Sequence, residues 1–180
     1  MEPDPDRTPT AADCSAMLPD LHDALRSYPG ELPALCANDI PRGLEMLDRG
    51  ATGLSGTDVD LLRVSAERLR PLWEAPGEEA QPLHGDAHPG NLISTRDGGL
   101  LWIDFEDVCL GPVEWDLATI MDPGAVAAHH RPDPEVLARC TELRALQVAL
   151  CLIAFRGDFG DIKGWDEGIR SMLGMLAEAS

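Results

Sequence analysis

Two short motifs enclose a segment of hairpin length in the middle of this chain, and their spacing restricts the local fold more than any other feature. The first motif is His-Gly-Asp-Ala-His-Pro-Gly-Asn at 84–91, and the second is Ile-Asp-Phe-Glu at 103–106. Between them, residues 92–94 and 100–103 are typical of two short strands, and Arg-Asp-Gly-Gly at 96–99 is typical of a hairpin turn. Pairing of these strands would bring the second motif back beside the end of the first.

The two motifs carry oxygen-bearing side chains in the order that phosphoryl transfer requires. Asp86 is placed to orient and deprotonate an acceptor hydroxyl, while Asn91 and Asp104 are placed to hold Mg²⁺. Because Mg²⁺ keeps several waters and also binds substrate phosphates, one Asn and one Asp are a sufficient protein contribution. Each motif alone is a weak signal, but their ordered combination favours catalysis.

A third block, Glu-Trp-Asp-Leu-Ala at 114–118, follows the two motifs. In this order the three blocks resemble the aminoglycoside phosphotransferase and choline kinase-like family of small-molecule kinases. The resemblance implies that Asp86 is the catalytic base, that Asn91 and Asp104 bind Mg²⁺ in the cofactor site, and that His84 shapes the loop of that site. It also implies that Asp116 braces the catalytic loop from the start of a helix.

Two further residues in the motifs have less defined roles. Glu106 is either a metal contact and part of the acceptor pocket, or solvated charge after a strand. His88 is expected to shape the loop and not to bind metal, because nothing nearby supplies a Cys or a second His at zinc spacing and Pro-Gly follows directly.

Helical periodicity surrounds the predicted hairpin. Before it, apolar residues recur at steps of three and four, most clearly after a Thr57 cap. After it, Asp133-Pro134 combines a cap with a proline at the first helical position. The predicted helices cover residues 18–25, 41–49, 59–73, 112–121, 134–156 and 165–176.

These elements predict an α+β, mainly α fold, in which a protein kinase-like C-terminal lobe carries the catalytic and metal-binding segments on a small β-hairpin. The resemblance covers residues 17–180, after a tail at 1–16 that we expect to be disordered because it is rich in Pro and charge. Kinases of this kind also have an N-terminal β lobe, whose glycine-rich loop and strand Lys hold the nucleotide. Here the only lysine, Lys163, follows the motifs, and the glycine-rich segment 50–56 indicates a linker.

We therefore expect the C-terminal lobe without the N-terminal β lobe. A start codon assigned too late, a truncated gene, or a nucleotide clamp supplied by another chain would each explain this.

Composition excludes several function classes. A formal net charge of −18 argues against nucleic-acid binding. The strongest apolar run, at 145–155, is too short to cross a bilayer, so no membrane association is expected. Five cysteines without a secretory signal favour reduced thiols and a cytoplasmic location. The acidity would suit a polycationic acceptor, or it reflects only the composition of the source and solubility.

The leading functional expectation is ATP- and Mg²⁺-dependent phosphoryl transfer to a hydroxyl of an aminoglycoside-like or other small alcohol. In this reading Asp158 and Asp161 either face an amino group of the acceptor or form plain surface. The rival expectation is a non-catalytic remnant or binding module that cannot hold ATP alone and needs the N-terminal lobe. The intact acidic and amide residues favour the first, and the lack of a suitable Lys favours the second.

Overall fold

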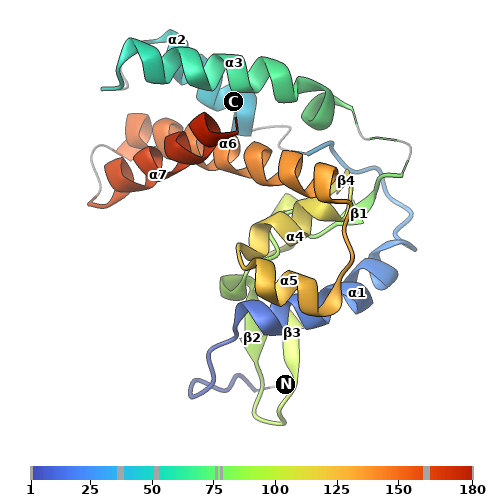
Figure 1. The fold of residues 1–180 in the computed structure, drawn as a ribbon. Helices are drawn as coiled ribbons and strands as arrows, with labels where there is room; N and C mark the ends of the chain where they lie inside the picture. Colours follow the sequence, from blue (N-terminus) through green and yellow to red (C-terminus); the bar gives the residue numbers. More distant parts are fainter. Residues whose placement is uncertain are drawn as a thin grey trace. The chain divides into compact units, whose positions relative to one another are not determined.

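The computed structural model describes residues 2–35, 39–50, 53–75, 77, 79–159 and 163–179 (Figure 1). Helices account for 61% of the residues, and the strands form two small antiparallel pairs, so the predicted α+β, mainly α fold is confirmed. The chain divides into two compact units, and each is built from two separate stretches of sequence. Met1–Leu35 and Pro76–Leu137 form the first unit, and Cys36–Ala75 and Ala138–Ser180 form the second.

The first helix, α1 (Ala11–Leu25), begins inside the segment predicted as a tail at 1–16. A capping box fixes its start, because the Thr10 hydroxyl accepts the Asp13 N–H and the Asp13 carboxylate accepts the Thr10 N–H. Upstream of this helix, the Asp4 N–H donates to the Ser94 carbonyl at 2.8 Å. The mobility expected of the tail stays a prediction.

The two strand pairs lie on either side of the motifs. β2 (Leu92–Ser94) and β3 (Leu100–Trp102) form the hairpin that the sequence predicts. β1 (Gln81–Leu83) pairs with β4 (Cys109–Gly111), and this pairing was not predicted, since such short segments show no readable alternation. The β1–β4 pair joins the chain just before the first motif to the chain just after the second.

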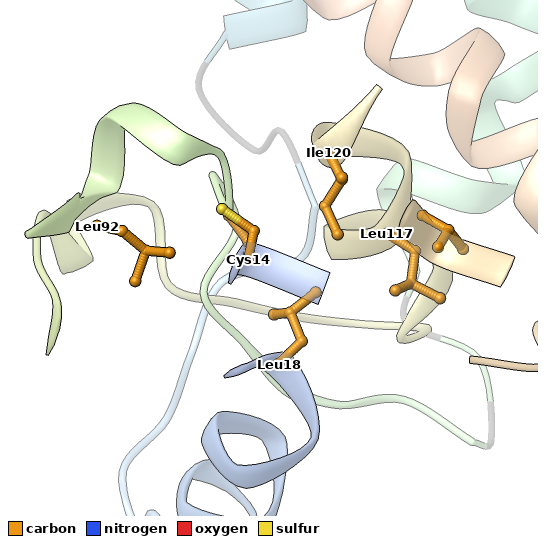
Figure 2. Close-up of a cluster of buried hydrophobic side chains, with 7 residues drawn as sticks. Cys14, Leu18, Leu92, Leu117 and Ile120 are labelled. Carbon is orange, nitrogen blue, oxygen red and sulfur yellow. The ribbon is translucent and has the colours of Figure 1, made fainter. Parts of the chain in front are cut away.

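A buried apolar cluster packs against the hairpin through Leu92 (Figure 2). It combines side chains of α1, β2, α4 (Glu114–Ile120) and α5 (Pro123–His129) with Ala87 of the first motif. Burial raises the pKa of the Cys14 thiol to about 11, so this thiol stays protonated and packs as a small apolar group. The cluster consists of Cys14, Leu18, Ala87, Leu92, Leu117, Ile120 and Val126.

The second unit is helical. The helix α3 (Gly56–Glu74) is capped by Ser55, two residues before the predicted cap Thr57. Ser55 and Asp58 form a capping box at its start. The Arg68 guanidinium binds both carboxylate oxygens of Glu142 and so links two helices of this unit. None of the helices in the described part of the chain combines the length and apolar character that crossing a bilayer requires. The helices are α2 (Asp39–Asp48), α3 (Gly56–Glu74), α6 (Pro134–Phe159), whose first turn belongs to the first unit, and α7 (Trp165–Glu178).

Candidate active site

The first motif forms a loop between β1 and the short 3₁₀ turn η1 (Pro89–Asn91). Its backbone is held by Asp116 of α4, whose side chain is fully buried. One carboxylate oxygen of Asp116 accepts the His84 N–H at 3.0 Å, and the other accepts the Gly85 N–H at 2.9 Å. The Trp115 indole N–H donates to the Gly85 carbonyl at 2.9 Å. The start of α4 therefore fixes the loop through three backbone groups.

His22 of α1 is a further partner of Asp116, and its role was not predicted from the sequence. Its Nε2 lies 2.9 Å from Asp116 Oδ2, and its side chain is buried. A buried carboxylate is stabilised when each of its oxygens has hydrogen-bond donors. The available signal was a histidine four residues after Leu18, on the apolar side of a helix that otherwise buries small and aliphatic residues.

His84 connects the two motifs. Its Nδ1 accepts the Asp86 N–H at 3.3 Å, so in the neutral ring Nε2 carries the proton and donates to the Ile103 carbonyl at 3.0 Å. The ring packs against Trp102 and Phe105, with ring centroids 5.1 and 4.7 Å away. These contacts suit a loop-shaping residue, and a direct role in cofactor binding stays a prediction.

The structure brings Asp86 and Asn91 together. The Asn91 side-chain nitrogen lies 2.8 Å from the Asp86 carbonyl oxygen and 3.0 Å from Asp86 Oδ2. Because the nitrogen faces Asp86, the amide oxygen of Asn91 points to the other side of the amide group. Asn91 is buried, whereas the Asp86 side chain is 23% exposed.

Hairpin pairing brings Asp104 close to Asn91 along the backbone. Leu92 is paired with Trp102, and the Ile103 N–H donates to the Asn91 carbonyl at 3.0 Å, so pairing extends to the residue before Asp104. Asp104 itself has φ 62° and ψ 62°, a left-handed conformation that is uncommon outside glycine. It precedes the 3₁₀ turn η2 (Phe105–Asp107), yet its side chain makes no capping hydrogen bond to that turn.

The donor set fits Mg²⁺. An amide oxygen that faces away from its own partner and an exposed carboxylate that caps nothing are hard oxygen ligands, and this ion needs few of them from protein. Within the described ranges, no group of three or more His, Cys, Asp or Glu side chains is arranged to hold a metal. Any ion bound here would therefore depend on water and phosphate oxygens for its remaining ligands.

The other predicted residues lie apart from this centre. Glu106 is exposed on η2, and among the described residues its side chain has no hydrogen-bond or ion-pair partner, so its role in metal binding stays a prediction. Asp161 and the side chain of Asp158 lie outside the described residues. His88, assigned to loop structure, caps η1 by accepting the Gly90 N–H at 3.0 Å, and it also lies next to Asp86.

Comparison with known proteins gives matches of two kinds. Residues 1–147 match the model of the phosphotransferase enzyme family. The fold is similar to that of choline kinase LicA from Streptococcus pneumoniae, with 17% identity and a TM-score of 0.70 over 96% of this chain and 67% of that one. No curated protein matches the sequence.

Two further structures extend the comparison. A microcompartment-associated aminopropanol kinase is 19% identical, with a TM-score of 0.63 over 97% of this chain and 62% of that chain. The GDP complex of aminoglycoside 2'-phosphotransferase-IIIa is 17% identical, with a TM-score of 0.60 over 94% and 62%. At these identities the likeness shows a protein kinase-like fold. The chain spans 62–67% of the length of these three structures.

Proposed function

Because the chain belongs to the phosphotransferase enzyme family, we propose that it transfers the γ-phosphoryl group of ATP, with Mg²⁺, to a hydroxyl group of a small molecule. One observation carries the proposal. Asp86 and Asn91 contact each other in a loop whose backbone is fixed by the buried Asp116, and the hairpin brings Asp104 to the same end of the sheet.

Each of these residues has a defined task in the proposed reaction. The acceptor oxygen forms a bond to the γ-phosphorus, the bond to the oxygen that bridges the β- and γ-phosphorus breaks, and ADP leaves. Asp86 takes the proton of the acceptor hydroxyl and directs its lone pair at phosphorus. Asn91 and Asp104 hold the metal, which, when bound, neutralises charge on the phosphate oxygens. His84 and Asp116 keep the loop in place.

The proposed acceptor is a small alcohol that carries a positive charge. Three structural neighbours are named as kinases of choline, aminopropanol or aminoglycosides, all of which combine a hydroxyl with an amino or ammonium group. A net charge of −18 would attract such acceptors. We do not expect nucleic acid as a partner, for the same electrostatic reason.

Transfer is tested with ATP, Mg²⁺ and a set of amino alcohols, by following the phosphorylated product with ³¹P NMR. Wild-type chain should form product, and Asp86→Asn should lower the rate by about 10²–10⁴-fold, the usual contribution of a positioned general base. Asp97→Asn, at the far end of the same hairpin, is the matched control and should keep full activity. An Asp86→Asn variant as fast as the control would contradict the assignment.

The alternative to transfer is that this chain binds its ligands without transferring phosphate. Among the 180 residues the single lysine, Lys163, follows the motifs. Calorimetric titration with Mg·ATP separates the two functions. Binding together with turnover supports transfer, whereas no nucleotide binding alongside measurable acceptor binding supports the second function.

A further inference from the structure

His88 makes two contacts, one through each ring nitrogen. Its Nδ1 accepts the Gly90 N–H at 3.0 Å, which fixes the start of η1. In the neutral ring the proton is therefore on Nε2. That nitrogen lies 3.2 Å from Asp86 Oδ2, the carboxylate of the proposed base.

Two nitrogen atoms thus converge on one oxygen of Asp86. His88 Nε2 is at 3.2 Å and Asn91 Nδ2 is at 3.0 Å from Oδ2. A partly exposed Asp side chain would otherwise exchange between rotamers, and a base must stay within a narrow range of position and direction to take a proton efficiently. Two contacts from the same short loop restrict both side-chain torsions of Asp86.

We propose that His88 is a positioning residue for Asp86, an inference that rests on the proposed phosphoryl transfer. His88 acts through Asp86 and is not itself assigned a contact with substrate or metal. The short spacing between the two residues explains how His88 can hold the side chain of Asp86. His88 is two residues after Asp86, and the His88 N–H donates to the Asp86 carbonyl at 3.0 Å, so the ring is folded back over the carboxylate.

Two substitutions separate the cap from the contact with Asp86. In His88→Asn the side-chain oxygen can still accept the Gly90 N–H, because Asn is a favoured cap, but the side chain is too short to reach Asp86. In His88→Gln a nitrogen can reach Asp86, while the cap is weakened. His88→Asn should therefore be the more stable of the two variants, and His88→Gln should be the faster one.

We expect His88→Asn to melt at the wild-type temperature, with kcat about 10- to 100-fold lower and KM for both substrates unchanged. His88→Gln should melt at a lower temperature and recover part of kcat. His129→Asn makes the same change at an exposed histidine of α5 and should leave both quantities unchanged. If His88→Asn keeps wild-type kcat in a chain that transfers phosphate, the positioning role is wrong while the proposed function stands.

A readout independent of turnover uses ¹⁵N NMR of the histidine rings. His88 should show an unprotonated Nδ1 and a protonated Nε2, and Asp86→Asn should shift the Nε2 resonance while Asp97→Asn does not. An Nε2 resonance that ignores Asp86→Asn overturns the inference whether or not the chain is active. If Asp86→Asn shifts the Nε2 resonance but the wild-type chain transfers no phosphate to any acceptor, the proposed function is overturned instead.

Discussion

Gly85 occupies a position in the loop of the first motif where an added Cβ would clash. Its φ of +87° is in the left-handed region, and a Cβ at this residue would come within 1.9 Å of the Asp107 carbonyl oxygen. The backbone of the first motif therefore touches the backbone just after the second. The amide groups that face Asp116 depend on this close approach.

Gly85→Ala should lower the free energy of unfolding by more than about 2 kcal/mol, because the left-handed conformation and the backbone clash both add to the cost. Gly98→Ala is the matched control. Gly98 has φ +85° but no atom within 4 Å of an added Cβ, so only the conformational cost of about 1–2 kcal/mol applies. Urea denaturation of both variants checks this, and equal costs would show that the clash is relieved by movement of the loop.

Asp104 has a strained backbone and an exposed carboxylate. A single substitution can therefore test its effect on stability and its proposed role in metal binding separately. Asp104→Gly should change the free energy of unfolding by less than about 1 kcal/mol, since Gly tolerates the left-handed conformation. It should nevertheless weaken Mn²⁺ binding, measured by electron paramagnetic resonance, because the proposed ligand is lost. Retention of wild-type Mn²⁺ affinity in Asp104→Gly would remove this residue from the metal site.

At the scale of elements, α4 is the helix on which the loop depends. Asp116, in its first turn, accepts the N–H groups of His84 and Gly85 and contacts His22 of α1, so a single carboxylate connects the loop to two helices. Removal of a buried acceptor leaves all of its donors without partners and away from water.

Asp116→Ala should therefore cost about 3–5 kcal/mol, the range for breaking a buried charged network. Asp122→Ala removes an Asp that caps α5 at an exposed position, and should cost only about 1 kcal/mol. Thermal or urea unfolding of the two variants gives the comparison. Similar costs would mean that the loop is held mainly by the buried apolar cluster to which Ala87 belongs.

The contact between α1 and α5 should be sensitive to pH. His130 Nε2 lies 2.8 Å from the Ser15 carbonyl, and burial, with smaller effects of His22 and His129, lowers the pKa of His130 from its ordinary value of 6.5. The unfolded chain then binds more protons than the folded chain as the pH falls. Stability from this residue is complete above about pH 6.5 and declines below it.

The measurement compares urea unfolding of wild type and His130→Gln at about pH 7.5 and about pH 5.5. Gln can still donate to the Ser15 carbonyl but does not titrate, so its loss of stability on acidification should be smaller. An identical loss in both proteins would assign the pH dependence to other residues.

Which elements could be predicted from the sequence depended on the range of the interactions that form them. Long helices show their period within the segment, and the hairpin has its turn residues between its strands, so both were predicted. The pairing of β1 with β4 depends on contacts between distant residues and was missed. The same applies to His22, whose partner Asp116 is 94 residues away. The seven-residue α5 was also missed, although Asp122-Pro123 carries the same cap and proline as Asp133-Pro134.

Within the site, the sequence was most informative at positions where the proposed chemistry allows few residue types. Asp86, Asn91 and Asp104 were selected because oxygen ligands and a base have few substitutes, and the structure brings the backbones of the two motifs together as the hairpin requires. The second contact of His88 could not be read from spacing, because the same sequence would serve a ring that turns away from Asp86.

At the scale of the whole molecule, the net charge of −18 creates a field that reaches beyond any single contact. If the acceptor is cationic, kcat/KM for an amino alcohol should fall with added salt more steeply than kcat/KM for a neutral alcohol of similar size. Steady-state kinetics at low and high ionic strength test this. Equal salt dependence would mean that the acidity reflects solubility only.

The cytoplasmic location stays a prediction.

Neither unit is a continuous stretch of chain, and this affects how the protein is made. A ribosome that adds roughly 5–20 residues per second releases α2 and α3 several seconds before Ala138–Ser180 exists. The first unit is complete by Leu137, whereas the apolar surfaces of α2 and α3 must wait for α6 and α7. During translation, the second unit is thus the part of the nascent polypeptide whose apolar surfaces stay uncovered longest.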